Sequence, residues 1–361
     1  MITTIIVAIL VIGILIFIHE LGHFLAAKWL GVRVEIFSLG FGPRIIGFTK
    51  GETDYRLSFI PLGGYVKLYG EHPETISSIA ETEKAFGFKK PWQKAIIVIA
   101  GPLANFLLAI FIFWFLFVSV GSYISPAKIG EVLPGSPAEK AGLKPGDKIL
   151  EINGKKIKSF QELIFSLRGN DIIKETVNLK IKRNKQIFEV KIKPELKEGY
   201  NIFGKKTKIP FIGIKSTQEI IHQKHDPISA FILAIQKVIE ITGLIFWAIY
   251  KLFTGELPFS TLGGPLTIGK MAGETARLGI FAFFSFTALL SINLGVINIL
   301  PLPMLDGGHL ILFGIEAIRK KPLSLKTQEL IFKIGLILII ALSIAVFYND
   351  ILKLLSGWKL P

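Results

Sequence analysis

Cysteine is absent from this chain of 361 residues. The protein therefore has no disulfide, no thiolate metal site and no cysteine nucleophile, and cysteine usage does not indicate a redox compartment. Acidic residues are also few: 27 Asp and Glu stand against 42 Lys and Arg, a formal net charge of +15. The basic residues are spread along the polar segments without a nucleic-acid-binding motif. We therefore expect no nucleic-acid partner and assign the basic excess to a membrane surface.

Apolar residues, by contrast, are abundant. They make up 51% of the chain, and the mean hydropathy is +0.55. This is too apolar for an ordinary soluble protein, whereas 19% charged residues is too many for membrane helices alone. The composition predicts a protein with the lipid bilayer as one partner, built from membrane spans and a water-soluble domain.

The apolar runs predict a polytopic α-helical membrane protein with four transmembrane helices, at residues 1–30, 95–121, 279–310 and 331–349. The first run has no positive leading region, since the first lysine is Lys28, and no small-residue cleavage site. It therefore predicts a span rather than a signal peptide.

Positive charges follow the first run at once, including Lys28, Arg33 and Arg44. They place the next segment, residues 31–94, in the cytoplasm of a plasma or inner membrane protein. A further apolar stretch lies within residues 226–270 and carries Lys237 and Glu240. We expect an interfacial amphipathic helix and a re-entry loop there. A full span at this point would put the carboxylate and histidines discussed below on opposite sides of the membrane.

Two segments have soluble character. Residues 31–94 alternate as short strands around Gly-rich turns, which indicates either a sheet edge that a peptide could join or an ordinary cytoplasmic hairpin. Residues 126–215 contain a strand at 148–152, an Asn153-Gly154 hairpin turn and a helix at 160–167. The sequence GLKPGDKILEINGKKI in this segment resembles a PDZ domain, an α/β domain whose groove binds extended peptides. On the membrane topology above, this domain lies on the outer side, and it could bind a peptide or screen an ectodomain.

The end of the first run carries His19-Glu20-Leu21-Gly22-His23. Two histidines four residues apart share one helix face and can bind one metal ion. Glu20 could then take a proton from a metal-bound water. The alternative is that these are polar groups at a helix end that reach the membrane surface. Ionisable groups inside membrane spans are rare and usually functional, which favours the metal site.

A catalytic zinc site needs a third protein ligand, and Asp306 in the segment Leu300-Pro301-Leu302-Pro303-Met304-Leu305-Asp306-Gly307-Gly308-His309 is the candidate. Two alternatives stay open. Asp306 could cap a following helix, and His309 could be the ligand instead. The second span opens with Gly101-Pro102-Leu103-Ala104-Asn105, which predicts close packing on a neighbouring helix, with Asn105 in an interhelical hydrogen bond.

HELGH, GPLAN, a single PDZ domain and NILPLPMLDGG together resemble the site-2 protease family, and within it the RseP-type bacterial intramembrane zinc metalloproteases of peptidase family M50. The resemblance implies Zn²⁺ bound by His19, His23 and Asp306, with Glu20 as the catalytic base. It also implies substrate binding by Asn298 with Asn293 nearby, and by a membrane-associated β-hairpin in FIPLGGYVKL that contains Gly63 and Gly64. One PDZ domain instead of the tandem of the best-known member departs from the pattern.

The expected function is regulated intramembrane proteolysis of single-span membrane proteins, such as anti-sigma factors or remnant signal peptides, with the active site near the cytoplasmic side. Two alternatives remain. A non-catalytic membrane PDZ scaffold leaves the ligand-like groups unexplained. An HtpX-type membrane zinc peptidase takes a glutamate as third ligand and does not account for the proline-broken LDGG segment.

Overall fold

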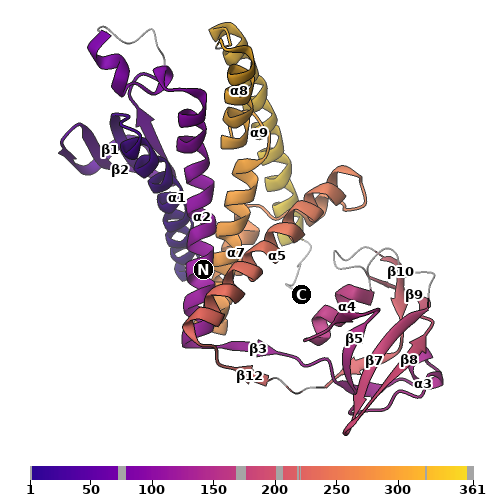
Figure 1. The fold of residues 1–361 in the computed structure, drawn as a ribbon. Helices are drawn as coiled ribbons and strands as arrows, with labels where there is room; N and C mark the ends of the chain where they lie inside the picture. Colours follow the sequence, from indigo (N-terminus) through magenta and orange to yellow (C-terminus); the bar gives the residue numbers. More distant parts are fainter. Residues whose placement is uncertain are drawn as a thin grey trace. The chain divides into compact units, whose positions relative to one another are not determined.

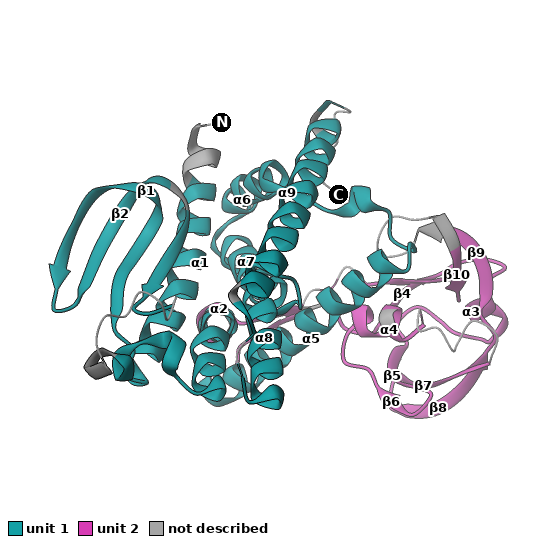
Figure 2. Cartoon of the chain, turned by 90° about the horizontal axis from the view of Figure 1, so that it is seen from above, with its two compact units in different colours: residues 1–117, 227–361 teal, residues 118–226 magenta. Residues whose placement is uncertain are grey.

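The computed structural model describes residues 2–71, 79–167, 176–200, 206–217, 219, 221–321 and 323–355. The chain forms two compact units. Unit 1 comprises residues 1–117 and 227–361, and unit 2 comprises residues 118–226 (Figure 2). The segment predicted as a soluble domain, 126–215, lies within unit 2, so it is inserted into a unit built mainly of helices.

Unit 1 contains α1 (Ile2–Trp29), α2 (Pro91–Ser119), α5 (Pro227–Phe253), α6 (Pro265–Leu278), α7 (Ile280–Ile299), α8 (Asp306–Arg319) and α9 (Leu325–Leu355) (Figure 1). Among the described residues, α1, α2, α5, α7 and α9 are long and apolar enough to cross a membrane. A helix thus lies at each of the four predicted spans, and α5 is a fifth candidate. The predicted third span, 279–310, is not one continuous helix: α7 ends at Ile299 and α8 starts at Asp306.

Small residues allow the central helices to pack closely. A Cβ added at Gly22 of α1 would lie 2.2 Å from the Ala100 carbonyl oxygen and 2.9 Å from Ala104 Cβ, both on α2. A Cβ at Gly295 of α7 would lie 3.2 Å from the Pro102 carbonyl oxygen. Glycine at such crossings lets helix backbones approach each other. The predicted close packing of the GPLAN segment is therefore confirmed, and α2 contacts both α1 and α7.

The segment between α1 and α2 folds into one sheet from two long strands, β1 (Val34–Lys50) and β2 (Thr53–Leu68). Each strand bends back on itself and so contributes two neighbouring segments to the sheet. Ile36, for example, pairs with Lys67 on one side and with Asp54 on the other. The register places four segments side by side in the order 44–50, 53–60, 34–41 and 64–68. The predicted short strands are parts of this sheet. Its segment 64–68 is an edge, and this edge lies against α1 (Figure 2).

In the sequence, two 3₁₀ helices follow β2 and precede α2: η2 (Ile79–Lys84) and η3 (Phe86–Phe88). Phe86 packs with Ala27, Val32, Val34 and Ile97 in a buried cluster, against which Phe313 of α8 also packs. This cluster joins the sheet, α1, α2 and α8, so it fixes the elements that carry the histidines relative to α8.

A polar cluster at the end of α9 holds the start of α6. Asp350 is 1% exposed and accepts hydrogen bonds from the backbone N–H groups of Gly264 (2.9 Å), Leu266 (2.9 Å) and Thr267 (3.1 Å). Asn349 donates to two carbonyls of the segment just before α6. A helix N-terminus has unpaired N–H groups and a positive dipole end, and both favour a carboxylate there. The cap here comes from another helix, so α9 and α6 are fixed together.

Unit 2 has ten strands and two helices among its described residues: β3 (Ser122–Ile124), β4 (Ile129–Val132), α3 (Pro137–Lys140), β5 (Lys148–Ile152), β6 (Lys155–Lys156), α4 (Phe160–Leu167), β7 (Val177–Arg183), β8 (Gln186–Ile192), β9 (Glu195–Tyr200), β10 (Lys206–Phe211), β11 (Ile214–Ser216) and β12 (Ile221–Gln223). The largest sheet has the order β6-β5-β7-β8. The predicted strand at 148–152 and helix at 160–167 are confirmed. Asn153 and Gly154 both have positive φ (47° and 79°), as their predicted hairpin turn requires.

One buried ion pair anchors the core of unit 2. Asp147 is fully buried, and both its carboxylate oxygens accept from the Arg183 guanidinium, at 2.7 Å and 2.8 Å. Burial opposes ionisation of Asp147, but the hydrogen bonds from Arg183 and from the Lys144 N–H outweigh it and lower the pKa of this carboxyl.

Candidate metal centre

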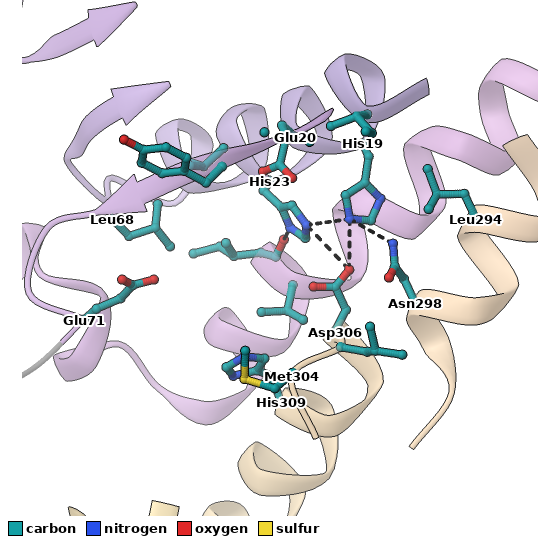
Figure 3. A pocket seen from close by; sticks show the side chains of 18 of the residues that line it. His19, Glu20, His23, Leu68, Glu71, Leu294, Asn298, Met304, Asp306 and His309 are labelled. Carbon is teal, nitrogen blue, oxygen red and sulfur yellow. Dashed lines mark hydrogen bonds and ion pairs between the residues drawn. The ribbon is translucent and has the colours of Figure 1, made fainter. Parts of the chain in front are cut away.

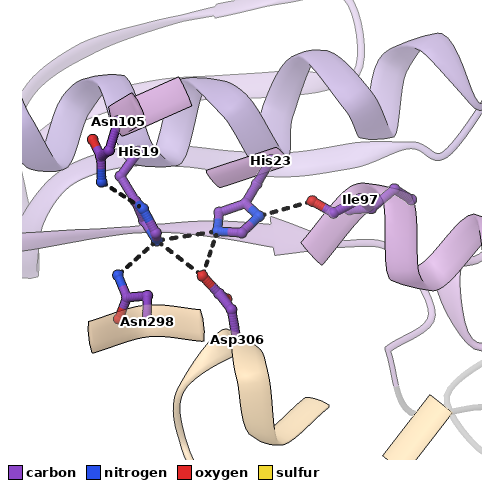
Figure 4. Close-up of polar contacts among 6 residues, drawn as sticks. All are labelled: His19, His23, Ile97, Asn105, Asn298 and Asp306. Atoms are coloured by element: carbon purple, nitrogen blue, oxygen red, sulfur yellow. Dashed lines mark hydrogen bonds and ion pairs between the residues drawn. The ribbon is translucent and has the colours of Figure 1, made fainter. Parts of the chain in front are cut away.

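The two histidines of α1 meet on one face of the helix. His19 Nε2 lies 3.3 Å from His23 Nε2, and the two rings are nearly perpendicular, with 4.8 Å between their centroids. His19 is 7% exposed. Both Nε2 atoms are directed toward α8, where Asp306 lies (Figure 4). The predicted helical register of His19 and His23 is therefore present.

Asp306 reaches the histidines because the chain breaks between α7 and α8. The two prolines of the Leu300–Leu305 segment cannot continue the helix, and Met304 adopts a positive φ of 75°. Two glycines then let α8 start directly against this turn. A Cβ at Gly307 would lie 2.1 Å from the Ile299 carbonyl oxygen, and one at Gly308 would lie 2.4 Å from the Leu302 carbonyl oxygen. The LDGG sequence thus has a steric reason for both glycines.

The ligand-like atoms form a compact triangle. Asp306 Oδ2 lies 3.2 Å from His19 Nε2 and 3.6 Å from His23 Nε2. A tetrahedral ion with bonds of ~2.0–2.1 Å sets its ligand atoms ~3.3–3.4 Å apart, close to all three separations. Asp306 Oδ2 is also buried, and it has no hydrogen-bond partner among the described residues. A bound cation would interact with this unpaired oxygen. The donor set of two imidazoles and one carboxylate fits catalytic zinc.

The helix-cap alternative for Asp306 does not hold. The N-cap of α8 is Leu305, and no side chain caps this helix. Asp306 is the first helical residue, and its carboxylate points toward His19 and His23 instead (Figure 3). The other alternative was His309 as ligand. His309 lines the same pocket, but its ring lies 5.1 Å from the Phe332 ring. Among the described residues, the group that could hold a metal ion is His19, His23 and Asp306.

Glu20 lies between the histidines and the sheet edge. Its carboxylate is hydrogen-bonded by the backbone N–H of Val66. A Cβ added at Gly64 would lie 3.1 Å from Glu20 Cγ and 2.9 Å from the Ser38 carbonyl oxygen. Gly63 has a φ of +124°, and a Cβ there would strike the Phe41 ring at 2.1 Å. Gly63 and Gly64 both line the pocket, and the space around each leaves no room for a side chain. Their predicted role in substrate binding stays a prediction.

The other predicted substrate-binding residues have different outcomes. Asn298 lines the pocket, and its Nδ2 lies 3.3 Å from His19 Nε2 (Figure 4). Asn293 is not among the residues that line this pocket. Five residues turn a helix by about 140° beyond one full circle, so Asn293 cannot share the face of Asn298. Substrate binding by Asn293 stays a prediction.

Helix α2 contributes contacts that the sequence did not reveal. The Ile97 carbonyl lies 2.9 Å from His23 Nδ1, and the Asn105 amide lies 3.1 Å from His19 Nδ1. A Cβ at Gly101 would lie 2.3 Å from His23 Nε2, so only glycine leaves room for this imidazole. The GPLAN motif predicted helix packing, but its residues also surround both histidines. The only signal was an amide and a glycine spaced four residues apart, which fits many packed helices.

An ion pair fixes α8 to α2 further along. Lys94 is 6% exposed, and its Nζ lies 3.1 Å from each carboxylate oxygen of Glu316. Glu316 shares α8 with Asp306, so this pair holds the helix that carries the third ligand-like group.

The site opens into a cavity of about 470 Å³. Its walls come from α1, the sheet edge, α2, α7 and the start of α8 (Figure 3). It contains Glu20, the histidines, Asn298 and Asp306, together with the edge residues Gly64, Tyr65 and Val66. The cavity therefore brings a metal-binding group, a carboxylate and a free strand edge to one place.

Comparison with known proteins agrees with this chemistry. A family model described as Peptidase family M50 matches residues 7–342. A protein of Agrobacterium fabrum is 37% identical, covering 96% of this chain and 95% of its own length. Proteins of Campylobacter jejuni (36% identical, 96% and 93% covered) and Rickettsia conorii (38% identical, 96% and 98% covered) are similar over the same extent. All three are named "Putative zinc metalloprotease" followed by a locus number.

Among solved structures, the chain is similar to the PDZ domain of the SdrC-like protein from Listeria monocytogenes. The identity is 27%, the match covers 26% of this chain and 87% of that domain, and the TM-score is 0.21.

Proposed function

Because this chain belongs to peptidase family M50 and is a zinc metalloprotease, we propose that it hydrolyses peptide bonds within or beside the transmembrane segments of single-span membrane proteins. The observation that carries this proposal is the triangle of His19 Nε2, His23 Nε2 and Asp306 Oδ2, which has the dimensions of a tetrahedral zinc site. All three residues belong to a unit rich in apolar helices.

In this proposal His19, His23 and Asp306 would hold zinc, which when bound supplies Lewis acidity and lowers the pKa of a water molecule so that it can lose a proton and act as a nucleophile near neutral pH. Glu20 takes a proton from the water as its oxygen forms the new C–O bond, and then delivers that proton to the nitrogen of the leaving amine, so that the scissile C–N bond breaks. Asn298 directs its amide toward the same space and donates to the substrate backbone there.

The free edge at residues 64–68 suits an extended substrate. A helical substrate hides its carbonyls in i→i−4 hydrogen bonds, so the scissile segment must unwind before attack. Pairing with a sheet edge replaces those lost hydrogen bonds. The edge lines the same cavity as Glu20, which supports the binding of a strand-shaped substrate beside that carboxylate. The sheet is the membrane-associated hairpin of this proposal, and its exposed apolar residues include Ile45, Ile46 and Phe59.

We propose further that α5 does not cross the membrane. Its start is tied to the far end of α2 by the Trp114 indole, which donates to the Pro227 carbonyl at 2.9 Å. The segment after α5 is tied to the last turns of α9 by Asn349 and Asp350. On α2, Trp114 lies nine residues beyond Asn105, which contacts His19. On α9, Asn349 lies 17 residues beyond Phe332, whose ring lies beside that of His309. In Figure 1, α5 also runs obliquely to α2 and α7.

With four spans, the amino terminus and unit 2 lie outside, and His23 and Asp306 lie near the cytoplasmic side of a plasma or inner membrane. Unit 2 would then act as a PDZ domain that meets the outer part of a substrate. The substrates are single-span proteins already shortened by another protease, such as anti-sigma factors, or remnant signal peptides.

The test separates metal binding from proton transfer. Glu20→Gln should keep zinc at the wild-type level yet lower cleavage of a single-span reporter by about 10²–10⁴-fold. Asp306→Ala should lose both zinc and cleavage. The exposed Glu52→Gln variant on the hairpin is the matched control and should retain both. Unimpaired cleavage by Glu20→Gln would refute its role as base, and full zinc content in Asp306→Ala would refute the ligand set.

A further inference from the structure

Helix α2 faces the back of both imidazoles. His23 Nδ1 lies 2.9 Å from the Ile97 carbonyl oxygen, and His19 Nδ1 lies 3.1 Å from Asn105 Nδ2. The Nε2 atoms of both rings face Asp306 on the opposite side. Each ring thus has one nitrogen toward the metal position and the other toward α2 (Figure 4).

Metal binding decides where the ring protons lie. A neutral imidazole carries one N–H, so a ring that binds zinc through Nε2 has its proton on Nδ1. For His23 this proton meets the Ile97 carbonyl, which accepts it. For His19 the proton would meet the Asn105 amide nitrogen, which is itself a donor. Two donors facing each other in a buried place are unfavourable, so the amide of Asn105 must present its oxygen when zinc is bound.

The side-chain oxygen of Asn105 is available for this hydrogen bond. Asn105 is fully buried, and its Oδ1 has no hydrogen-bond partner among the described residues. A half-turn about the last side-chain bond exchanges oxygen and nitrogen in nearly the same space. The exchange pairs Oδ1 with the Nδ1 proton of His19.

We propose that Asn105 is a positioning residue of the metal centre: in the zinc-loaded protein its Oδ1 accepts the Nδ1 proton of His19 and fixes this imidazole with Nε2 on the metal. This rests on the proposed zinc ligands and extends them by an outer partner on a different helix. Such partners set the tautomer and orientation of a ligating histidine, and their removal typically lowers metal affinity 10–100-fold.

The surroundings of Asn105 keep its side chain in place. Ser291 Oγ of α7 donates to the Asn105 backbone carbonyl at 2.8 Å. Four residues before it, Gly101 brings α2 against His23. The position of Asn105 is therefore fixed from α1 and from α7, the two helices that lead to the ligand residues.

The experiment compares two substitutions of similar size in the full-length protein. Asn105→Asp can accept the Nδ1 proton but cannot donate, whereas Asn105→Leu can do neither. Zinc content and the rate of zinc loss to excess EDTA are measured on the purified proteins, with Co²⁺ absorption as a second report of the ligand geometry. Thr287→Val is the control, since it removes a buried hydroxyl that donates within α7 to the Phe283 carbonyl.

We expect Asn105→Leu to lose zinc 10–100-fold faster than wild type and to show an altered Co²⁺ spectrum. Asn105→Asp and Thr287→Val should match wild type or hold zinc longer. Wild-type retention by Asn105→Leu would overturn the proposal. Loss of zinc by Asn105→Asp to the same degree as Asn105→Leu would also overturn it, because an acceptor alone would then not suffice.

Failure of the ligand set itself has a different signature. If His19, His23 and Asp306 do not bind zinc, alanine at His19 or Asp306 leaves the zinc content of the protein unchanged. If the ligands are right and Asn105 has no positioning role, those alanine variants lose zinc while Asn105→Leu does not. Thermal unfolding of the zinc-free variants shows whether each one is folded. If Asn105→Leu proves to be unfolded, the comparison rests on Asn105→Asp.

Discussion

Replacing Gly101 by alanine should remove zinc without unfolding the protein. The added Cβ would lie 2.3 Å from His23 Nε2 and 2.5 Å from His23 Cε1. These distances are about 1 Å short of the 3.4 Å at which ordinary van der Waals contact begins. The imidazole must move by that amount, whereas a metal site tolerates only ~0.2 Å in its ligand distances. His23 also loses its bond to the Ile97 carbonyl if the ring swings away.

The effect on folding should be small by comparison. Overpacking typically destabilises by ~1–3 kcal/mol, and alanine in a helix gains back ~1 kcal/mol over glycine. We therefore expect Gly101→Ala to fold with a slightly changed thermal midpoint, to hold zinc at least ~100-fold more weakly, and to lose reporter cleavage. Zinc is measured by elemental analysis and by competition with a chelator, and folding by thermal unfolding in detergent.

Gly13→Ala is the matched control for this experiment. It is a glycine of α1 with nothing within 4 Å of its added Cβ, so it changes helix propensity alone. It should keep wild-type zinc and cleavage. Stoichiometric zinc in Gly101→Ala, with an unchanged rate of loss to the chelator, would show that the space beside His23 is not what this glycine provides.

Three more predictions follow from other contacts. Lys94→Met should lower the thermal midpoint, because it leaves the partly buried Glu316 without its partner at a loss of about 3 kcal/mol. The double variant Lys94→Met/Glu316→Leu should regain most of the lost midpoint in the same thermal scan, and equal midpoints for both variants would contradict this. The lowered pKa of Asp147 means that its ion pair stabilises unit 2 at neutral pH and ceases to do so as the pH falls below about 4. Hydrogen–deuterium exchange of β5 and β7 should thus be faster in Asp147→Asn than in wild type at pH 7, and this difference should shrink as the pH falls below about 4; a constant difference would argue against the linkage. Because the chain has no cysteine, a single Gly255→Cys can be labelled in an otherwise unaltered protein, and it should react from the side opposite to Lys28→Cys; reaction from the same side would mean that α5 crosses.

Much of the metal centre could be predicted because its information is local. The four-residue spacing of His19 and His23 fixes their shared face on any helix, and the proline-broken turn before Asp306 marks a special position in an apolar segment. Asn293 lies five residues before Asn298, and this spacing puts the two side chains on different faces of α7, so closeness in sequence does not predict a shared site. The role of Asn105 could not be predicted, since it depends on how α1 and α2 cross, and that crossing is set by Gly22 and its neighbours.

The fold shows the same division. The long apolar runs predicted where the long helices lie, although α7 ends at Ile299 rather than at the predicted residue 310. Turn signals such as Asn153-Gly154 predicted hairpins. The sheet order 44–50, 53–60, 34–41, 64–68 could not be predicted, because a strand that folds back leaves no periodic signal at its bend. The cap of α6 by Asp350 was also invisible, since the carboxylate and the helix start are 86 residues apart.

The wide separation of the interacting groups along the polypeptide has a consequence during synthesis. His19 and Asn298 are 279 positions apart, and Asp306 comes later still. A ribosome that adds ~5–20 residues per second needs on the order of 15–60 s between the first histidine and the carboxylate. Throughout that interval the nascent protein has two imidazoles and no third ligand. A newborn copy therefore remains inert beside other nascent membrane proteins until its own last third has been inserted.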